Sequence, residues 1–268
     1  MTAWDTLAAE RTGVPVLAPG HVWLAGAGPG DPGLLTLDAL AGLQQAEVIV
    51  YDALVDARVL ALAGRQAQLE FAGKRGGKPS ATQADISRRL VELAHAGRRV
   101  LRLKGGDPFM FGRGGEETAA LSAAGIPFRV IPGITAGLAA LAAAAIPATL
   151  RGVNRAVIFA AAHAVEEDFD WAPLARTGQP IVLYMVMHSL ERIAAALMQT
   201  GLAGTTPAAV IASATTPHER ILISTLEKLA ADSREQKFEP PAIVVIGDIV
   251  NARERLLSPR LSSRAPGT

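Results

Sequence analysis

The chain has 268 residues, half of them apolar, and a formal net charge of +1. This length and composition allow one large or two ordinary globular domains with a sizeable core. Because the sequence contains no cysteine, disulfides, thiolate nucleophiles, iron–sulfur clusters and cysteine zinc sites are excluded.

Neither a membrane span nor a signal peptide is expected. The longest apolar stretch, Ala136 to Pro147, is mostly alanine and too short to cross a bilayer. The N-terminus carries Asp5 and Glu10 and lacks the basic start and apolar core of a signal peptide. We therefore expect a cytoplasmic protein that does not interact with membranes.

Charge is unevenly distributed along the chain. Residues 74–155 contain 13 Lys plus Arg against 5 Asp plus Glu, whereas residues 1–73 contain 3 against 8. Solvated helix faces account for part of this excess, and Arg88, Arg89, Arg98 and Arg99 are expected on them. Nucleic-acid binding is not favoured, because few aromatic residues accompany the charges. A small polyanionic ligand fits the basic segment better.

The first half of the chain reads as alternating strands and helices. Residues 1–20 show no clear period and are expected to form a loose leader. Beyond them, strands are predicted near 21–25, 47–51, 68–72, 100–103 and 128–131, and helices near 34–43, 54–63, 82–96 and 116–124. This alternation predicts a five-stranded, largely parallel unit.

A second α/β unit is predicted in the rest of the chain. Strands are expected at 156–160, 181–185, 208–212 and 242–247, and helices include 190–198 and 225–231. We divide the chain into a leader (1–20), an N-terminal α/β domain (21–133), a C-terminal α/β domain (134–250) and a tail (251–268).

The stretch from Arg102 to Glu117, RLKGGDPFMFGRGGEE, runs from a strand into a glycine-rich loop. Gly105 and Gly106 remove two side chains at a strand's carboxyl end, where a ligand can approach bare backbone, and Asp107 offers an acceptor. This density of glycines and charges indicates a binding loop. The segment 132–136, PGITA, is a second candidate loop, or equally a domain boundary with a cap for the next helix.

The segment 28–33, GPGDPG, matches the G-x-G-x-x-G pattern of dinucleotide-binding folds, and Asp52 follows where such folds keep their ribose acid. However, Pro29 and Pro32 remove two amides that would hold a pyrophosphate, and Asp31–Pro32 is typical of a helix start. A nicotinamide-dependent oxidoreductase therefore remains an alternative from a different class.

Six motifs in this order resemble the uroporphyrinogen-III C-methyltransferases, a family of class III S-adenosylmethionine-dependent enzymes. They are VWLAGAGPGDP at 22–32, YDALV at 51–55, GKR at 73–75, the stretch 102–117, PGITA at 132–136 and ATTP at 214–217. The resemblance covers roughly residues 21–250. It implies two α/β domains of the tetrapyrrole methylase type, each with a mostly parallel-containing sheet flanked by helices, and an active-site cleft between them.

The resemblance also implies the reaction. Two methyl groups would pass from S-adenosylmethionine to C2 and C7 of uroporphyrinogen III, giving precorrin-2 via precorrin-1 for cobalamin, siroheme or related pigments. It further implies a homodimer without a metal. We expect no counterpart of the fused dehydrogenase and chelatase domain that some relatives carry, and therefore methyl transfer alone. The alternatives within this chemistry are a methylase of a later corrin intermediate and a non-catalytic tetrapyrrole-binding protein.

Site residues follow from the resemblance position by position. Asp52 is assigned proton acceptance and Lys74 proton donation, and the positions of Arg113 and Glu116 are tied to activity in a relative that makes the heme d1 precursor. Cofactor contacts are assigned to Pro29, Gly105, Gly106, Asp107, Met110, Thr135, Ala136, Met185 and Ala214. The chain departs from the family at Leu150, where relatives usually have His, and at residues 161–163, where they have Thr-Gly-His.

This reaction suits the residue inventory. A sulfonium methyl donor needs no metal or thiol, only alignment with a carbon nucleophile in a site that excludes water. Uroporphyrinogen III carries carboxylates on every pyrrole ring, which basic loop residues could bind; these are Lys74, Arg75, Lys78, Arg113, Arg151 and Arg155. Asp52 also suits a helix cap for Leu54 onward, and Lys74 also suits a carboxylate anchor.

Overall fold

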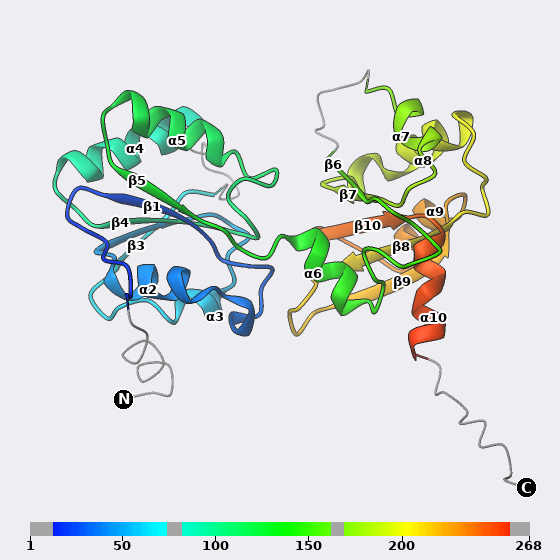
Figure 1. Cartoon of the computed structure of the whole chain (residues 1–268), viewed down its shortest axis with the longest axis horizontal. Coiled ribbons are helices and arrows are strands. Elements are labelled where there is room, and N and C mark those ends of the chain that lie inside the picture. Colours follow the sequence, from blue (N-terminus) through cyan, green and yellow to red (C-terminus); the bar gives the residue numbers. More distant parts are fainter. Residues whose placement is uncertain (1–12, 74–81, 162–168, 258–268) are drawn as a thin grey trace, which may run out of the picture. The chain divides into compact units, whose positions relative to one another are not determined.

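A computed structural model describes residues 13–73, 82–161 and 169–257 of the chain (Figure 1). The chain divides into two compact units, Met1–Ala136 and Gly137–Thr268. Lys74, with Arg75 and Lys78, lies outside the described residues, as does His163.

The first unit is built on a parallel sheet. Among the described residues it has five strands in the order β3-β2-β4-β1-β5, and every neighbouring pair is parallel. The strands are β1 (Val22–Gly26), β2 (Val48–Tyr51), β3 (Gln68–Phe71), β4 (Val100–Lys104) and β5 (Phe128–Ile131). The five-stranded parallel unit expected from the sequence is confirmed.

Helices cover both faces of this sheet. α2 (Leu37–Gln45) and α3 (Ala57–Leu60) lie on one face, and α4 (Gln83–His95) and α5 (Gly114–Ala123) lie on the other (Figure 1). Successive β4 residues alternate between the two layers: Leu101 packs with the α2 layer and Val100 with the α4 and α5 layer. The central strand is thus buried on both sides.

Local sequence explains where these helices start. Thr82 and Asp85 form a capping box that begins α4. Asp31 caps the short 3-10 helix Pro32–Leu34 by accepting from the Gly33 amide, as its sequence indicates. The helix expected at 54–63 is shorter than predicted, because Asp56 caps α3 and the turn before it is not helical.

Part of the expected leader packs on the first unit. Leu17 is buried in the α2 layer of the core, and its amide donates to the Gln45 side chain at 3.0 Å. Gln45 in turn donates to the Pro15 carbonyl at 3.0 Å. The described end of the leader is therefore anchored to the C-terminal turn of α2.

The second unit contains a mixed sheet. In the described part of the chain its strand order is β6-β7-β10-β8-β9, with bounds β6 (Ile158–Ala161), β7 (Ile181–Tyr184), β8 (Pro207–Ala212), β9 (Arg220–Thr225) and β10 (Ala242–Ile246). β6 and β7 are parallel, whereas the other three pairs are antiparallel. The mostly parallel sheet expected for this half is thus corrected.

The short connection 213–219 explains one antiparallel pair, because a parallel crossover needs a dozen or more residues. β9 itself was not predicted: residues 220–225 pair with β8, and the helix expected at 225–231 is displaced to α9 (Leu229–Glu235). Residues 220–225 include several β-branched residues, which favour a strand, and they form an edge strand of this sheet.

The described part of this half contains four more helices. They are α6 (Ala136–Ala143), α7 (Ala172–Arg176), α8 (Leu190–Gln199) and α10 (Ala252–Leu257), with 3-10 turns at Met187–Ser189 and Asp248–Asn251. In α8, Leu190, Ile193 and Leu197 are buried at the spacing of one helix face. None of the helices in the described ranges has the length and hydropathy that a bilayer crossing requires.

Candidate active site

The candidate site of the first unit lies where two neighbouring strands lead to helices on opposite faces of the sheet. β1 and β4 are neighbours, yet the chain leaves β1 toward the α2 face and leaves β4 toward the α5 face. In open α/β sheets, ligands bind outside the carboxyl ends of strands at such a switch point. The loops that follow β1, β4 and β5 are therefore the relevant ones.

The backbones of these three loops are interlocked. Gly28 and Gly106 exchange two hydrogen bonds, N to O at 3.2 and 2.8 Å. A Cβ on Gly133 would lie 2.2 Å from the Gly106 carbonyl oxygen and 2.7 Å from the Gly26 Cα. Side chains at these contacts would separate the loops, so the glycines allow main chain to pack on main chain.

Asp107 ties the β4 loop to the β5 loop. Its Oδ1 accepts from the amides of Phe109 and Met110 at 2.8 and 3.1 Å, and its Oδ2 accepts from the Gly133 amide at 3.0 Å. A carboxylate with three amide donors is well satisfied without a metal or a lysine. Asp107 thus stabilises the backbone conformation of both loops.

The two glycines that begin the β4 loop have different roles. A Cβ on Gly105 would lie 2.5 Å from the Leu54 Cβ, so Leu54 occupies the space that the sequence suggested for a ligand. Gly106 has φ +67°, a conformation that favours glycine. A Cβ there would lie 3.5 Å from the Ala136 amide and 3.7 Å from the Thr135 Cα.

Asp52 lies at the carboxyl end of β2, beside this loop. Its Oδ1 accepts from the amides of Leu54 at 3.0 Å and Gly105 at 3.4 Å, and its Oδ2 lies 3.9 Å from Arg102 Nη2. Asp52 therefore caps a turn and not a helix, because α3 begins only at Ala57. A quarter of its side chain remains exposed, so a substrate group could reach it.

Three charged residues that sequence reasoning left without a role form a buried cluster beneath the loop. Arg102 and Lys104 of β4 both contact Glu117 of α5, at 3.0 Å each. Burial lowers the pKa of Lys104 below its ordinary value, and the Arg102 charge acts in the same direction. The available signal was the alternation in β4, where charged residues at 102 and 104 share one face of a central strand.

Arg113 and Glu116 stand on the exposed first turn of α5. Two hydrogen bonds join the guanidinium to the carboxylate, at 2.8 and 2.7 Å. The bond to Glu116 raises the pKa of Arg113, and the bond to Arg113 lowers the pKa of Glu116. Arg113 has φ +58°, an uncommon backbone conformation for a residue with a side chain.

In the second unit, Met185 and Ala214 lie at one edge of the mixed sheet. β7 and β8 flank β10 and run in the same direction, so the residues that follow them emerge together. Met185 follows β7, has φ +58° and is 51% exposed. Ala214 is buried, between Ser213 and Thr215, whose φ angles are +49° and +66°. Such backbone is costly and clusters at functional sites.

The loop that contains Leu150 is organised by Asn154, which sequence reasoning did not single out. The Asn154 amide oxygen accepts from the Leu150 amide at 2.8 Å, and its nitrogen donates to the carbonyls of Ala148 and Ala156 at 2.9 and 3.0 Å. Arg151 and Arg155 are exposed on this loop. Leu150, where relatives usually have histidine, therefore lies in a loop that Asn154 stabilises and that has basic residues at its surface.

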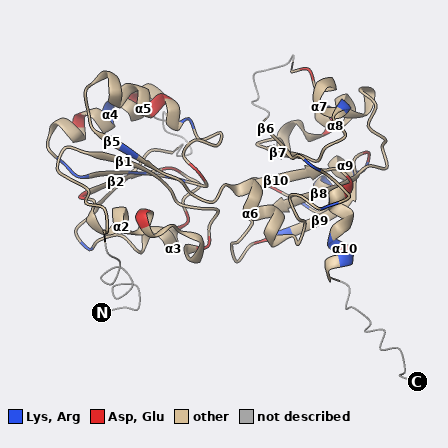
Figure 2. Cartoon of the chain, in the orientation of Figure 1, with Lys and Arg blue, Asp and Glu red and all other residues tan. Residues whose placement is uncertain are grey.

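The basic excess of residues 74–155 is partly neutralised by acids from earlier in the chain. Arg89 pairs with Glu70 at 2.8 Å, Arg99 pairs with Glu47 at 3.5 Å, and Arg129 pairs with Asp38. Figure 2 shows acidic and basic residues interspersed over the helices of the first unit. The expectation of solvated helix faces thus holds for Arg88 and Arg89, which are exposed in surface ion pairs on α4.

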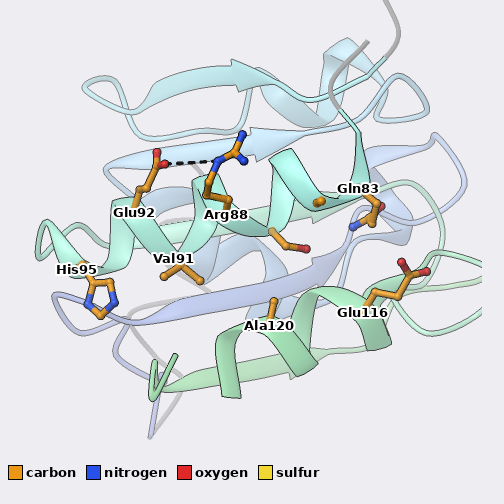
Figure 3. A pocket seen from close by; sticks show the side chains of 9 residues that line it. Gln83, Arg88, Val91, Glu92, His95, Glu116 and Ala120 are labelled. Carbon is orange, nitrogen blue, oxygen red and sulfur yellow. Dashed lines mark ion pairs between the residues drawn. The ribbon is translucent and has the colours of Figure 1, made fainter. Parts of the chain in front are cut away.

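A hollow lies between α4 and α5 (Figure 3). It is lined by Gln83, Ala84, Ser87, Arg88, Val91, Glu92, His95, Glu116 and Ala120. Of the described candidate residues, Glu116 alone borders it, so the hollow is separate from the glycine loops. Within the described ranges, no group of three or more acidic or histidine residues is placed to hold a metal.

The structure thus gathers most cofactor candidates at the carboxyl edge of the first sheet: Pro29, Gly105, Gly106, Asp107, Met110, Thr135 and Ala136. Met185 and Ala214 lie at one edge of the second sheet. Asp52 adjoins the first group.

Comparisons with known proteins identify the family to which the chain belongs. Residues 21–230 match the family model of tetrapyrrole (corrin/porphyrin) methylases. The chain is 53% identical over 248 residues to a uroporphyrinogen-III C-methyltransferase of Sinorhizobium sp., covering 91% of this chain and 89% of that one. It is 44% identical over 252 residues to the siroheme synthase of Azotobacter vinelandii, covering 93% of this chain and 54% of that protein.

A solved structure is also similar. The uroporphyrin-III C-methyltransferase of Thermus thermophilus, crystallised with S-adenosylhomocysteine, aligns with a TM-score of 0.74 and 39% identity, over 87% of this chain and 99% of that one. The family resemblance and the two expected α/β units are confirmed, with the second sheet mixed instead of mostly parallel. This chain belongs to the tetrapyrrole (corrin/porphyrin) methylases.

Proposed function

We propose that the protein transfers two methyl groups from S-adenosylmethionine to C2 and C7 of uroporphyrinogen III, giving precorrin-2 by way of precorrin-1. The observation that carries the proposal is the likeness to a uroporphyrinogen-III C-methyltransferase over nearly the whole chain. The site geometry supports it, because the loops that the family assigns to the cofactor meet at a switch point. The product would serve siroheme, cobalamin or related pigments.

The cofactor candidates fit a sulfonium methyl donor. When bound, this co-substrate supplies a methyl group that is already activated, so the protein has to align and shield it. Main-chain atoms of Thr135 and Ala136 lie within 4 Å of the position that a Cβ would take on Gly106. Asp107 fixes the loop geometry by accepting hydrogen bonds from three amides. In the second unit, exposed Met185 offers a polarizable side chain.

For the substrate, we assign Asp52 to accept the proton that the tetrapyrrole loses elsewhere when a methyl group is added to its ring carbon. Its position at a strand end, partly exposed and held by two amides, supports this role. Lys74, outside the described residues, remains the proposed proton donor. Arg113 and Glu116 are proposed to contact the substrate, where the planar guanidinium suits a carboxylate.

Homodimer formation and a cytoplasmic location are also part of the proposal. Light scattering of the purified protein at micromolar concentration should give the mass of a dimer. A monomer mass would overturn the dimer and leave the reaction unaffected.

Two alternatives are less well supported. A methylase of a later corrin intermediate would share the cofactor loops, but the 53% identity to a uroporphyrinogen-III methyltransferase favours the earlier substrate. A nicotinamide enzyme needs free amides in the segment 28–33, whereas the Gly28 amide donates to Gly106 and the Gly33 amide donates to Asp31.

Titration calorimetry with S-adenosylhomocysteine and with NADH tests the choice of co-substrate. We expect saturable binding of S-adenosylhomocysteine at one site per chain and none of NADH. Binding of NADH without S-adenosylhomocysteine would contradict the proposal.

A further inference from the structure

The buried cluster beneath the β4 loop centres on one oxygen atom. Glu117 Oε1 accepts from Arg102 Nε at 3.0 Å, from Lys104 Nζ at 3.0 Å and from Gln83 Nε2 at 3.1 Å. The side chains of Arg102, Lys104 and Glu117 are only 3%, 4% and 0% exposed. Within the described residues, Glu117 Oε2 has no hydrogen-bond partner.

Such a cluster is a poor way to stabilise a fold. Removing several charges from water costs free energy that their mutual attraction does not reliably offset, and an unmade hydrogen bond adds to the cost. Arg102 and Lys104 occupy the central strand of the sheet, where apolar residues would pack without this cost. The position of this cluster so close to Asp52 points to a role in the site.

One connection runs from Glu117 to Asp52. The Arg102 guanidinium lies between the two carboxylates: its Nε contacts Glu117 at 3.0 Å, whereas its Nη2 is 3.9 Å from Asp52 Oδ2. Arg102 Nη1 is held by the carbonyls of Val50 and Leu103, both at 3.3 Å. Glu117 is therefore the closer anionic partner, and without its charge Asp52 would be the remaining carboxylate next to Arg102.

A second connection runs along α5. Arg113 and Glu116 occupy the exposed side of the first turn, and Glu117 occupies the buried side of the same turn. No side-chain hydrogen bond caps the start of α5. The ion pairs from Glu117 to β4 fasten this turn to the sheet, together with the hydrogen bond from the Gly114 amide to the Pro108 carbonyl. The position of the Arg113 guanidinium thus depends on Glu117.

We propose that Glu117 is a positioning residue for methyl transfer, whose charge holds Arg102 off Asp52 and fixes the helix turn that carries Arg113 and Glu116. The inference rests on the proposed function. Glu117 itself touches neither substrate nor cofactor. Its charge, rather than its shape, is what the mechanism needs.

Two substitutions separate charge from shape. Glu117→Gln keeps the shape and removes the charge, whereas Glu117→Asp keeps the charge on a shorter chain that the long Arg102 and Lys104 side chains can still reach. We expect kcat of Glu117→Gln to fall about 10- to 100-fold, the size of effect that misplacement by an ångström can have. Glu117→Asp should retain clearly more of the wild-type kcat. S-adenosylhomocysteine affinity should stay within about twofold in both, less than 0.5 kcal/mol.

The rates are taken per folded site, counted by S-adenosylhomocysteine stoichiometry, so that lost stability does not mimic lost turnover. Glu92→Gln is the matched control, because Glu92 also pairs with two arginines, Arg88 and Arg89, but at the exposed surface of α4. It should behave as wild type. Methyl transfer absent from wild type and control would contradict the proposed function itself.

The inference is overturned if folded Glu117→Gln turns over at the wild-type rate, or if Glu117→Asp is slower than Glu117→Gln, which a role in packing predicts. Should Glu117→Gln fail to fold, the double variant Lys104→Met/Glu117→Gln replaces it. That variant removes one buried charge of each sign, a change that folds tolerate better. It should still be slow, because Asp52 is then the remaining carboxylate beside Arg102, and wild-type turnover in it would equally refute the inference.

Discussion

Asp107 accepts a hydrogen bond from the amide of Gly133 at 3.0 Å and thereby joins two loops that lie 26 residues apart in the chain. The same carboxylate holds the amides of Phe109 and Met110. The geometry of the candidate cofactor site therefore depends on a side chain that need not touch the cofactor.

Replacing Asp107 by Asn tests this dependence. The amide nitrogen cannot accept a hydrogen bond, so either the β4 turn or the link to Gly133 is lost. Hydrogen bonds to charged groups contribute about 1.5–3 kcal/mol, and we expect S-adenosylhomocysteine to bind about tenfold or more weakly, measured by calorimetry. Asp170→Asn, which alters an exposed carboxylate that accepts from the Ala172 amide, should leave binding unchanged. Equal affinity of Asp107→Asn and wild type would show that the link is dispensable.

Gly106→Val should weaken S-adenosylhomocysteine binding, because the new side chain would extend toward Thr135 and Ala136. Gly125→Val provides the control. Gly125 has the same φ of +67° but nothing within 4 Å of its Cβ position, so it carries the strain without the neighbours. Both variants should unfold at lower temperature than wild type. Similar affinity losses in both would mean that strain, not position, is responsible.

Asp52→Asn should slow turnover while leaving cofactor binding intact. Loss of a general base costs on the order of 10² to 10⁴ in rate, and the near-isosteric amide can still accept from Leu54 and Gly105. Steady-state kinetics of methyl transfer would measure the effect. Asp56→Asn, which alters the carboxylate that caps α3, is expected to match wild type. A normal kcat for Asp52→Asn would reduce Asp52 to a turn cap.

The capping box of α4 gives a prediction for pH. Hydrogen bonding by the Thr82 amide lowers the pKa of Asp85 in the folded protein below its ordinary value. A lowered folded-state pKa contributes stability above the unfolded-state value of about 3.9, and this stability is lost as pH falls through the folded-state pKa. The unfolding temperature of Asp85→Ala should thus lie below wild type at pH 7, and the gap should narrow toward pH 3. A gap independent of pH would contradict the assignment.

Much of the fold could be predicted because its signals are local. The strand and helix order of the first unit follows from apolar periodicity, and Thr82 and Asp31 mark helix starts through their own side chains. The displaced helix near 225 shows the limit, because β9 is stabilised by pairing with β8 and not by its own pattern.

The candidate site was less accessible to sequence reasoning. Gly105 was expected to leave room for a ligand, whereas Leu54, from another loop, fills that space. The contact between Glu117 and Lys104 depends on how α5 packs across β4, which no local pattern encodes. Both are tertiary relationships, and they decide which of the loop residues can face a ligand.

The most direct test of the central claim is an anaerobic assay of the purified protein with uroporphyrinogen III and S-adenosylmethionine, with the product followed by mass. We predict a product that has gained two methyl groups, formed through a singly methylated intermediate. Failure to methylate uroporphyrinogen III, by protein that binds S-adenosylhomocysteine at one site per chain, would contradict it.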